Sequence, residues 1–303
     1  MPIKRKGYKE YDGPPMIAII SDLHANAEAL NAVLEDADRM GADRIVCLGD
    51  IVGYGPDPVV CTDIVMSRAH DATIVGNHDY ALIHGPVGFN YIAAGVIHVT
   101  RKAMDPAAAE SCPNIAECAN PIKGDGIIEC ARDRMLPKCF EMKHSRREHW
   151  EFIDRLPGQL REKDLLFVHG SPLIPIWEYV LPDIFAAAWD TGRLAEMFEK
   201  VEWLCFCGHT HFPCAITGDY RCVYPADVRG PFKLRRDLKY IINAGSVGQP
   251  RDGDNRSCYV LFDEKSDTME WRRVPYDIEA VVEKVARTCG IDNRCGTRLR
   301  EGR

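Results

Sequence analysis

The 303-residue sequence has no apolar stretch long enough to span a membrane, and basic residues are outnumbered by acidic ones. A transmembrane helix needs about 20 consecutive apolar residues, so we expect no membrane partner. The 38 Lys and Arg residues against 45 Asp and Glu residues give a formal charge of −7. Surfaces that bind nucleic acid are normally basic, and this balance therefore argues against a nucleic-acid partner.

The N-terminus lacks the apolar segment of a secretory signal peptide. Residues 1–15, MPIKRKGYKEYDGPP, supply basic residues but no hydrophobic run behind them. We therefore expect a cytoplasmic protein in which residues 1–15 form a flexible tail. The sequence also lacks internal repeats and low-complexity segments. It is consistent with one domain over residues 16–290, followed by a polar tail at 291–303, and it does not indicate an oligomeric state.

The sequence has thirteen cysteines, and the four between residues 112 and 139 do not follow a common zinc-binding spacing. In a protein that is not secreted, free thiols or metal ligands are more common than disulfides. Cys47, Cys205 and Cys207 fall in strand-like runs and are expected to be small buried apolar residues. Residues 105–144 are rich in Pro, Cys and charge and lack clear periodicity, which predicts an ordered accessory insertion. Its four cysteines could bind a structural metal, form disulfides or stay free: Cys112, Cys118, Cys130 and Cys139.

Five short apolar runs each end in a polar cluster, and these clusters hold most of the chemistry of the chain. The runs are IAIISDLH, RIVCLGD, ATIVGNHD, LLFVHG and WLCFCGHTH. Their length and composition are typical of strands buried on both faces. Ligands of open α/β sheets bind beyond the carboxyl ends of parallel strands, so we expect the polar side chains to converge on metal ions, with two ions expected. The donors are Asp22, His24, Asp50, Asn77, His78, Asp79, His169, His209 and His211.

The remaining pattern predicts an α/β fold. Helices are expected after Asp22, after Asp50 with Asp57 as N-cap, and at about 90–104 and 145–156. Alternating strands and helices indicate βαβ units with parallel strands. Beyond His211 the alternation of strands and turns predicts a second, largely antiparallel sheet, closed by a helix at 277–288. The predicted fold is an α/β two-sheet sandwich, a mixed parallel sheet packed on an antiparallel sheet, flanked by helices.

The five motifs resemble those of the calcineurin-like metallophosphoesterases, which read D-x-H, G-D, G-N-H-D/E, a single His after a strand, and G-H-x-H. Here they are Asp22-Leu23-His24, Gly49-Asp50, Gly76-Asn77-His78-Asp79, His169-Gly170 and Gly208-His209-Thr210-His211. The resemblance covers about residues 16–275, apart from the insertion. GYGP at 53–56, GSP at 170–172 and NAGSVGQPR at 243–251 are similar to a subgroup of small bacterial phosphatases and phosphodiesterases.

The resemblance implies two metal sites that share Asp50. The first would be held by Asp22, His24, Asp50 and His211, and the second by Asp50, Asn77, His169 and His209. Oxygen and imidazole donors without thiolate suit Mn²⁺, Fe or Zn²⁺. Two such ions activate a bridging hydroxide for attack on a phosphoester. The resemblance makes His78 the candidate general acid, and Arg251 is a candidate phosphate-binding residue, with a solvated loop arginine as the alternative.

Several assignments have alternatives. Many relatives carry an acid three residues after the shared aspartate, whereas this chain has Gly53, so Asp79 or a backbone carbonyl is expected to orient His78. Trp177 and Tyr179 either stack on a substrate or pack in the core. The leading function is a dinuclear-metal-dependent phosphoesterase acting on small phosphorylated molecules or nucleotides. The alternatives are a phosphoprotein phosphatase and a non-catalytic binding scaffold of the same fold.

Overall fold

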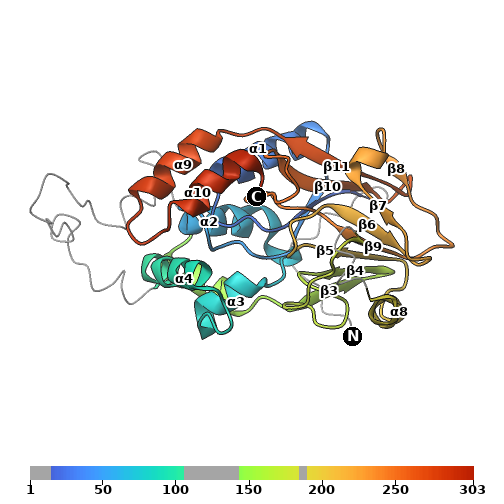
Figure 1. Cartoon of the computed structure of the whole chain (residues 1–303), viewed down its shortest axis with the longest axis horizontal. Helices are drawn as coiled ribbons and strands as arrows, with labels where there is room; N and C mark the ends of the chain where they lie inside the picture. Colours follow the sequence, from blue (N-terminus) through green and yellow to red (C-terminus); the bar gives the residue numbers. More distant parts are fainter. Residues whose placement is uncertain (1–14, 106–142, 184–189) are drawn as a thin grey trace, which may run out of the picture.

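Two β-sheets pack face to face in the computed structural model, with helices on their outer faces (Figure 1). The structure describes residues 15–105, 143–183 and 190–303. Residues 1–14 of the predicted tail at 1–15 and residues 106–142 of the predicted insertion at 105–144, with Cys112, Cys118, Cys130 and Cys139, lie outside the described residues. The predicted α/β two-sheet sandwich is confirmed.

Both sheets mix parallel and antiparallel neighbours. In spatial order the first sheet contains β2 (Arg44–Cys47), β1 (Met16–Ile20), β10 (Ser257–Asp263), β11 (Thr268–Val274) and β8 (Phe232–Lys233). The second contains β3 (Gln159–Glu162), β4 (Leu165–Val168), β5 (Leu204–Cys207), β9 (Tyr240–Asn243), β6 (Cys214–Thr217) and β7 (Cys222–Val223).

We had expected the strands after His211 to form a second sheet of their own, but they are divided between the two sheets. Instead β10 pairs antiparallel with β1, while β9 pairs parallel with β5. The physical reason is that each short parallel pair, β1–β2 and β4–β5, has an edge of unpaired backbone groups, which must be satisfied when it is buried. The late strands satisfy one such edge in each sheet.

Alternate residues of the buried strands face two different apolar layers. Ile17 and Ile19 of β1 face the layer between the sheets, where the Phe167 and Phe206 rings stack with centroids 5.6 Å apart. Ala18 and its neighbours on the other face pack against helices. Because both faces are buried, these strands read in the sequence as continuous apolar runs.

The helices cover the outer faces and the site edge. They are α1 (Ala27–Arg39), α2 (Pro58–Ala69), α3 (Asn77–His84), α4 (Tyr91–Met104), α7 (Arg146–Asp154), α8 (Thr191–Glu199), α9 (Ile278–Arg287) and α10 (Arg294–Thr297). Helices α1 and α2 pack on the first sheet, and α8 packs on the second. Among the described residues, no helix is both long and apolar enough to cross a bilayer.

The run ATIVGNHD is not a regular strand, contrary to our expectation. Thr73 forms a single bridge with Cys47, and the chain enters α3 at Asn77. The 3₁₀ turn His70–Ala72 leaves few residues for pairing, and the Val75 N–H donates to the Pro157 carbonyl instead of a strand. The polar residues at the end of the run, Asn77 and His78, still lie at the same edge of the sandwich as the other donors.

Residues 291–303 are folded against the domain rather than forming a polar tail. They contain α10 and a 3₁₀ turn, Arg298–Glu301, and α9 and α10 lie side by side (Figure 1). Ile291, Cys295 and Leu299 are buried in an apolar cluster with Val96 of α4 and Val285 of α9. Their spacing of four residues is helical, but the surrounding charged residues hide it in a reading of composition.

Asp57 precedes α2, as predicted, but its side chain does not cap the helix. Its carboxylate is 1% exposed and lies 2.8 Å from the Nζ of Lys284 on α9. Burial raises the pKa of Asp57 to about 6, and Lys284 opposes that rise. The pair therefore ties α9 to the start of α2.

Lys284→Ala should lower the free energy of unfolding by about 2–3 kcal/mol at pH 7.5, because it leaves a buried carboxylate uncompensated. The loss should shrink as the pH falls toward about 6 and be small below it, because without Lys284 the folded Asp57 carboxyl takes up its proton at a higher pH than in the wild type. Urea denaturation measures both. Lys163→Ala is the matched control, since Lys163 meets Glu264 at 2.6 Å but is 73% exposed. Its expected loss is below about 1 kcal/mol. Equal losses for the two variants would contradict this account of Asp57.

Candidate metal centre

The donor side chains predicted at the strand ends lie together at one edge of the sandwich. Strands β1 and β2 of the first sheet and β4 and β5 of the second all end there. The loops after these strands carry Asp22 and His24, Asp50, His169, and His209 and His211, respectively, while Asn77 and His78 open α3. The site therefore draws on both sheets and not on a single parallel sheet.

A first group of donors consists of Asp22, His24 and His211. The Nε2 atom of His211 lies 3.3 Å from Asp22 Oδ1 and 3.2 Å from His24 Nε2. The side chains are at most 2% exposed. His24 Nε2 also lies 3.7 Å from Asp50 Oδ2. These are separations at which ligand atoms surround one ion about 2 Å from each.

A second group consists of Asn77, His169 and His209. The Nε2 atom of His169 lies 3.0 Å from Asn77 Oδ1 and 3.4 Å from Asp50 Oδ2. Ligand atoms of Asp50, His169 and His209 all lie within 4.8 Å of one another. The same Asp50 oxygen thus faces both groups.

Each of the four histidines in the two groups has one ring nitrogen that faces the centre and one that is hydrogen-bonded to a backbone carbonyl. The N–H groups donate from His24 Nδ1 to Val52 (3.2 Å), His169 Nδ1 to Leu48 (3.0 Å), His211 Nδ1 to Gln249 (2.5 Å) and His209 Nε2 to Trp177 (3.2 Å). A carbonyl can only accept, so these bonds fix the tautomers. Three histidines therefore present Nε2 to the centre, and His209 presents Nδ1.

The backbone at the centre is held in an uncommon conformation. Left-handed φ values occur at Asp22 (54°), His24 (46°), Asp50 (53°), His209 (65°) and His211 (63°). Such residues cost about 1–3 kcal/mol each and persist where the surrounding structure enforces them. A Cβ atom at Gly208 would lie 2.5 Å from Asp22 Oδ2, so glycine is required for this close approach. Strain concentrated on the donors is typical of functional sites.

The centre holds ionisable groups away from water. Burial would raise the pKa of Asp22, but the imidazoles of His211 and His169 bring it below its usual value. Burial lowers the pKa of His24 well below its usual value. Asp22 Oδ1 is buried without a hydrogen-bond donor, an arrangement that costs several kcal/mol unless a cation compensates it. The oxygen and imidazole donors fit Mn²⁺, Fe or Zn²⁺.

His78 lies against the centre without joining either group. Its backbone N–H donates to Asp50 Oδ1 at 2.8 Å, and its ring packs between Tyr54 and Phe89, with centroid distances of 4.7 and 4.8 Å. Its Nδ1 atom is buried without a hydrogen-bond partner. Ring packing, rather than a hydrogen bond, therefore orients His78.

Asp79 does not orient His78, and no backbone carbonyl accepts a hydrogen bond from its buried Nδ1, so both alternatives that we had considered are wrong. Its carboxylate accepts the N–H groups of Ile51, Val52 and Gly76 at 2.9–3.2 Å and so holds the Asp50 loop. The other position for an orienting acid is closed, because a Cβ at Gly53 would lie 2.2 Å from His78 Nδ1.

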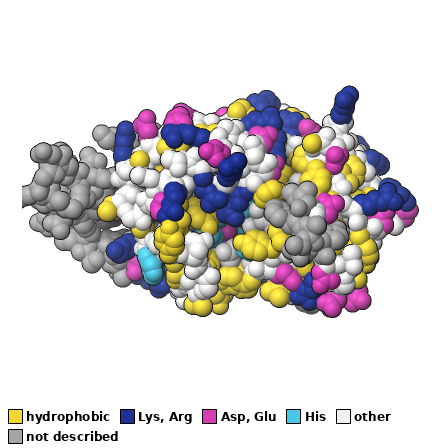
Figure 2. Space-filling model, in the orientation of Figure 1, with side chains coloured by type: hydrophobic (Ala, Val, Ile, Leu, Met, Phe, Trp, Pro, Cys, Tyr) yellow, Lys and Arg dark blue, Asp and Glu magenta, His cyan; other side chains and the backbone are white. Residues whose placement is uncertain are grey.

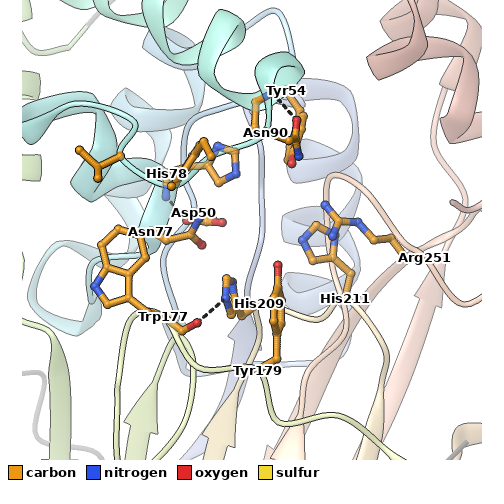
Figure 3. A pocket seen from close by; sticks show the side chains of 14 residues that line it. Asp50, Tyr54, Asn77, His78, Asn90, Trp177, Tyr179, His209, His211 and Arg251 are labelled. Carbon is orange, nitrogen blue, oxygen red and sulfur yellow. Dashed lines mark hydrogen bonds between the residues drawn. The ribbon is translucent and has the colours of Figure 1, made fainter. Parts of the chain in front are cut away.

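A pocket of about 270 Å³ opens over the centre (Figure 3). Its lining includes Asp50, Tyr54, Asn77, His78, Val87, Phe89, Trp177, Tyr179, His209, His211 and Arg251. Arg251 lies on the side opposite His78 and Trp177 (Figure 3), and its guanidinium donates to Gln249 Oε1 at 2.7 Å. The structure thus brings together the seven donors, His78 and Arg251.

The sequence indicated only part of the apolar lining of this pocket. Trp177 and Tyr179 are 42% and 51% exposed, so the core-packing reading is wrong. The Tyr179 ring stacks on His209 with a centroid distance of 4.0 Å. Val87 and Phe89 were missed because the Gly-Pro turn after α3 signals a loop without showing where it lies.

His144 and His149 converge on Asp63, away from the centre. Asp63 Oδ1 lies 2.9 Å from His149 Nε2 and 3.1 Å from His144 Nδ1. The two carboxylate oxygens also accept the N–H groups of Lys143 and His144. This network joins the chain after residue 142 to α2, which gives the cluster a structural account.

A two-sheet α/β sandwich with these donors at its carboxyl edge defines a metallophosphoesterase. Comparison with known families agrees, because residues 16–267 match the calcineurin-like phosphoesterase superfamily domain. The chain belongs to this superfamily.

Similar proteins extend over nearly the whole chain. It is 34% identical over 295 residues to an uncharacterized protein of Methanocaldococcus jannaschii, covering 95% of this chain and 98% of that protein. A crystal structure of a metallophosphoesterase from Sphaerobacter thermophilus is 33% identical, covers 95% of this chain and 100% of that one, and gives a TM-score of 0.69. A hypothetical protein of Pyrococcus horikoshii, at 15% identity and a TM-score of 0.63, covers 95% and 98% and shares the fold.

Proposed function

We propose that the protein hydrolyses phosphoesters of small molecules or nucleotides at a centre of two metal ions. The observation that carries this proposal is the position of Asp50, whose Oδ2 faces His24 on one side and His169 on the other. The first ion would be held by Asp22, His24, Asp50 and His211, and the second by Asp50, Asn77, His169 and His209. Mn²⁺, Fe and Zn²⁺ all suit these donors.

When bound by these residues, two cations would supply the charge that lowers the pKa of a water and neutralises phosphoryl oxygens during in-line attack. The protein contributes the rest. His78, at the pocket wall beside Asn77, donates a proton to the departing oxygen. Arg251, on the opposite side, binds a phosphoryl oxygen that does not react. The backbone carbonyls hold the histidine tautomers, so the site does not have to rearrange on binding.

The pKa of His78 bears on its role. Burial lowers this pKa to about 4, Asp50 raises it and Arg251 lowers it further. The ring is therefore neutral at pH 7 in the free protein. A bound phosphoester is anionic, and an adjacent negative charge favours the protonated imidazole. The charge of the substrate thus favours uptake from solvent of the proton that His78 gives to the leaving group.

The Mn²⁺-loaded protein should hydrolyse p-nitrophenyl phosphate or its bis ester, and excess EDTA should abolish the activity until Mn²⁺ is restored. The physical reason is that the proposed chemistry requires the metal charge. A panel of phosphomonoesters, diesters, dinucleoside polyphosphates and a phosphopeptide measures which esters are cleaved. Hydrolysis that persists in EDTA, or no hydrolysis of any member by loaded protein, would refute the proposal. Cleavage of the phosphopeptide alone would favour a phosphoprotein phosphatase.

A further inference from the structure

Some of the large exposed apolar side chains lie at the opening of the pocket. Among the described residues the large exposed apolar side chains are Tyr80, Val87, Tyr91, Ile174, Trp177, Tyr179 and Tyr220. Three of them, Val87, Trp177 and Tyr179, line the pocket together with the half-buried Phe89. Tyr80 extends this group, because its ring meets Trp177 edge-on at 5.4 Å. We call Val87, Phe89, Trp177 and Tyr179 the apolar wall.

Part of the apolar wall supports the metal centre, and part does not. Tyr179 stacks on His209, and Phe89 packs on His78, so both help to hold residues of the centre. Trp177 holds His209 through its backbone carbonyl, not through its indole ring. Val87 is 84% exposed. The Trp177 and Val87 side chains therefore leave apolar surface in water, and exposed apolar patches commonly mark binding sites.

The apolar wall lies where the leaving group of a phosphoester would be. A proton donor must approach the departing oxygen to about 2.6–3.2 Å. If His78 is that donor, the group attached to the oxygen lies beside the His78 ring, which Phe89 contacts. Figure 2 shows a hollow near the centre of this face, with basic side chains on one side and hydrophobic ones on the other. Arg251 lies across the pocket from Trp177 (Figure 3). The pocket thus has a cationic side and an apolar side.

The apolar side suits a flat ring better than a hydroxylated chain. Val87, Phe89 and the Trp177 ring face offer no hydrogen bonds to hydroxyl groups, whose burial without partners is unfavourable, and Tyr179 offers only its one hydroxyl. Aromatic side chains bind planar rings by stacking, which is worth about 1–3 kcal/mol per nucleobase. A volume of about 270 Å³ is small among ligand pockets, so the occupant is a single small molecule.

We propose that the apolar wall binds a planar aromatic group on the leaving-group side of the substrate. The substrates would then be phosphoesters of nucleosides or of other alcohols that carry an aromatic ring, rather than of aliphatic alcohols such as glycerol. This inference rests on the proposed phosphoesterase function and narrows its substrate class.

Binding of phenylphosphonate and methylphosphonate to the Mn²⁺-loaded protein, measured by calorimetry, tests this inference. The two probes share the phosphonate group and differ by the ring. Phenylphosphonate should bind about tenfold more tightly to the wild type. Trp177→Ala should reduce that preference to less than about threefold and leave methylphosphonate binding unchanged, because the backbone carbonyl that holds His209 is retained. Trp177→Phe should restore most of the preference.

A second variant of the apolar wall and a control variant complete the experiment. Val87→Ala should weaken phenylphosphonate binding by a smaller factor. Because the Val87 side chain is highly exposed, its truncation should not impair folding. Tyr220→Ala is the matched control, since Tyr220 is an exposed aromatic residue, 39% exposed, in the turn between β6 and β7. It should leave both affinities unchanged.

The outcomes separate the inference from the function on which it rests. Equal binding of the two phosphonates by wild type would overturn the inference and leave the phosphoesterase function standing. A preference for phenylphosphonate that survives both Trp177→Ala and Val87→Ala would also overturn it. If the loaded protein binds neither phosphonate, both the inference and the proposed function fail.

Discussion

Asp50→Asn is expected to lower kcat/KM for p-nitrophenyl phosphate by at least about 10³-fold, more than any other single change in the centre. Metal ions supply several kcal/mol of charge stabilisation in the transition state, and each 1.36 kcal/mol is worth about tenfold in rate. Asp50 faces both donor groups and also accepts the backbone N–H of His78. An amide offers one oxygen without negative charge, so the variant should hold less than two equivalents of metal.

Steady-state kinetics and elemental analysis of the same preparation measure the effect of Asp50→Asn. Asp36→Asn is the control, because Asp36 is also a buried carboxylate but lies on α1 and accepts its hydrogen bonds from Tyr259 and Arg272. It should keep its metal and its activity. A folded Asp50→Asn variant that retained two equivalents and wild-type kcat would show that Asp50 does not bridge.

His78→Ala is expected to retain both metals and to lose activity according to the leaving group. General acid catalysis contributes about 10²–10⁴-fold, so an alkyl phosphate should be hydrolysed slower by that factor. A p-nitrophenolate departs without a proton, and its loss should stay below about tenfold. The comparison requires kcat for both esters and the metal content of the variant.

His98→Ala provides the control for His78→Ala, because His98 is an exposed histidine on α4. This variant should hydrolyse both esters with the kcat of the wild type. Equal losses on both esters, together with loss of one metal, would make His78 a ligand instead of an acid. Its approach to His24 and Asp50 makes that a real alternative outcome.

The sequence allowed the donor set to be predicted because each donor directly follows a buried apolar run. A strand fixes where its last residue points, so a motif such as Gly208-His209-Thr210-His211 is placed by its strand alone. The same argument located Asp22 and His169, although β1 and β4 belong to different sheets. The position of each donor directly after an apolar run was enough to predict the donor set, although the assignment of strands to sheets was wrong.

The features that could not be predicted depend on packing between segments far apart in the chain. Asp57 was predicted to cap a helix, but its carboxylate instead forms an ion pair with Lys284, which lies 227 residues later in the chain. Ile291, Cys295 and Leu299 are buried only because α4 and α9 lie beside them. The sequence alone favoured core packing for Trp177, whose side chain is in fact 42% exposed at the pocket. In each case the sequence gives the residue type, and the tertiary contact decides its role.

Anomalous diffraction from crystals of the Mn²⁺-loaded protein tests the central claim most directly. The account predicts two peaks about 3.5–4 Å apart, both in contact with Asp50. One should lie against Asp22, His24 and His211, and the other against Asn77, His169 and His209. A single peak, or two peaks that do not share Asp50, would contradict the dinuclear centre.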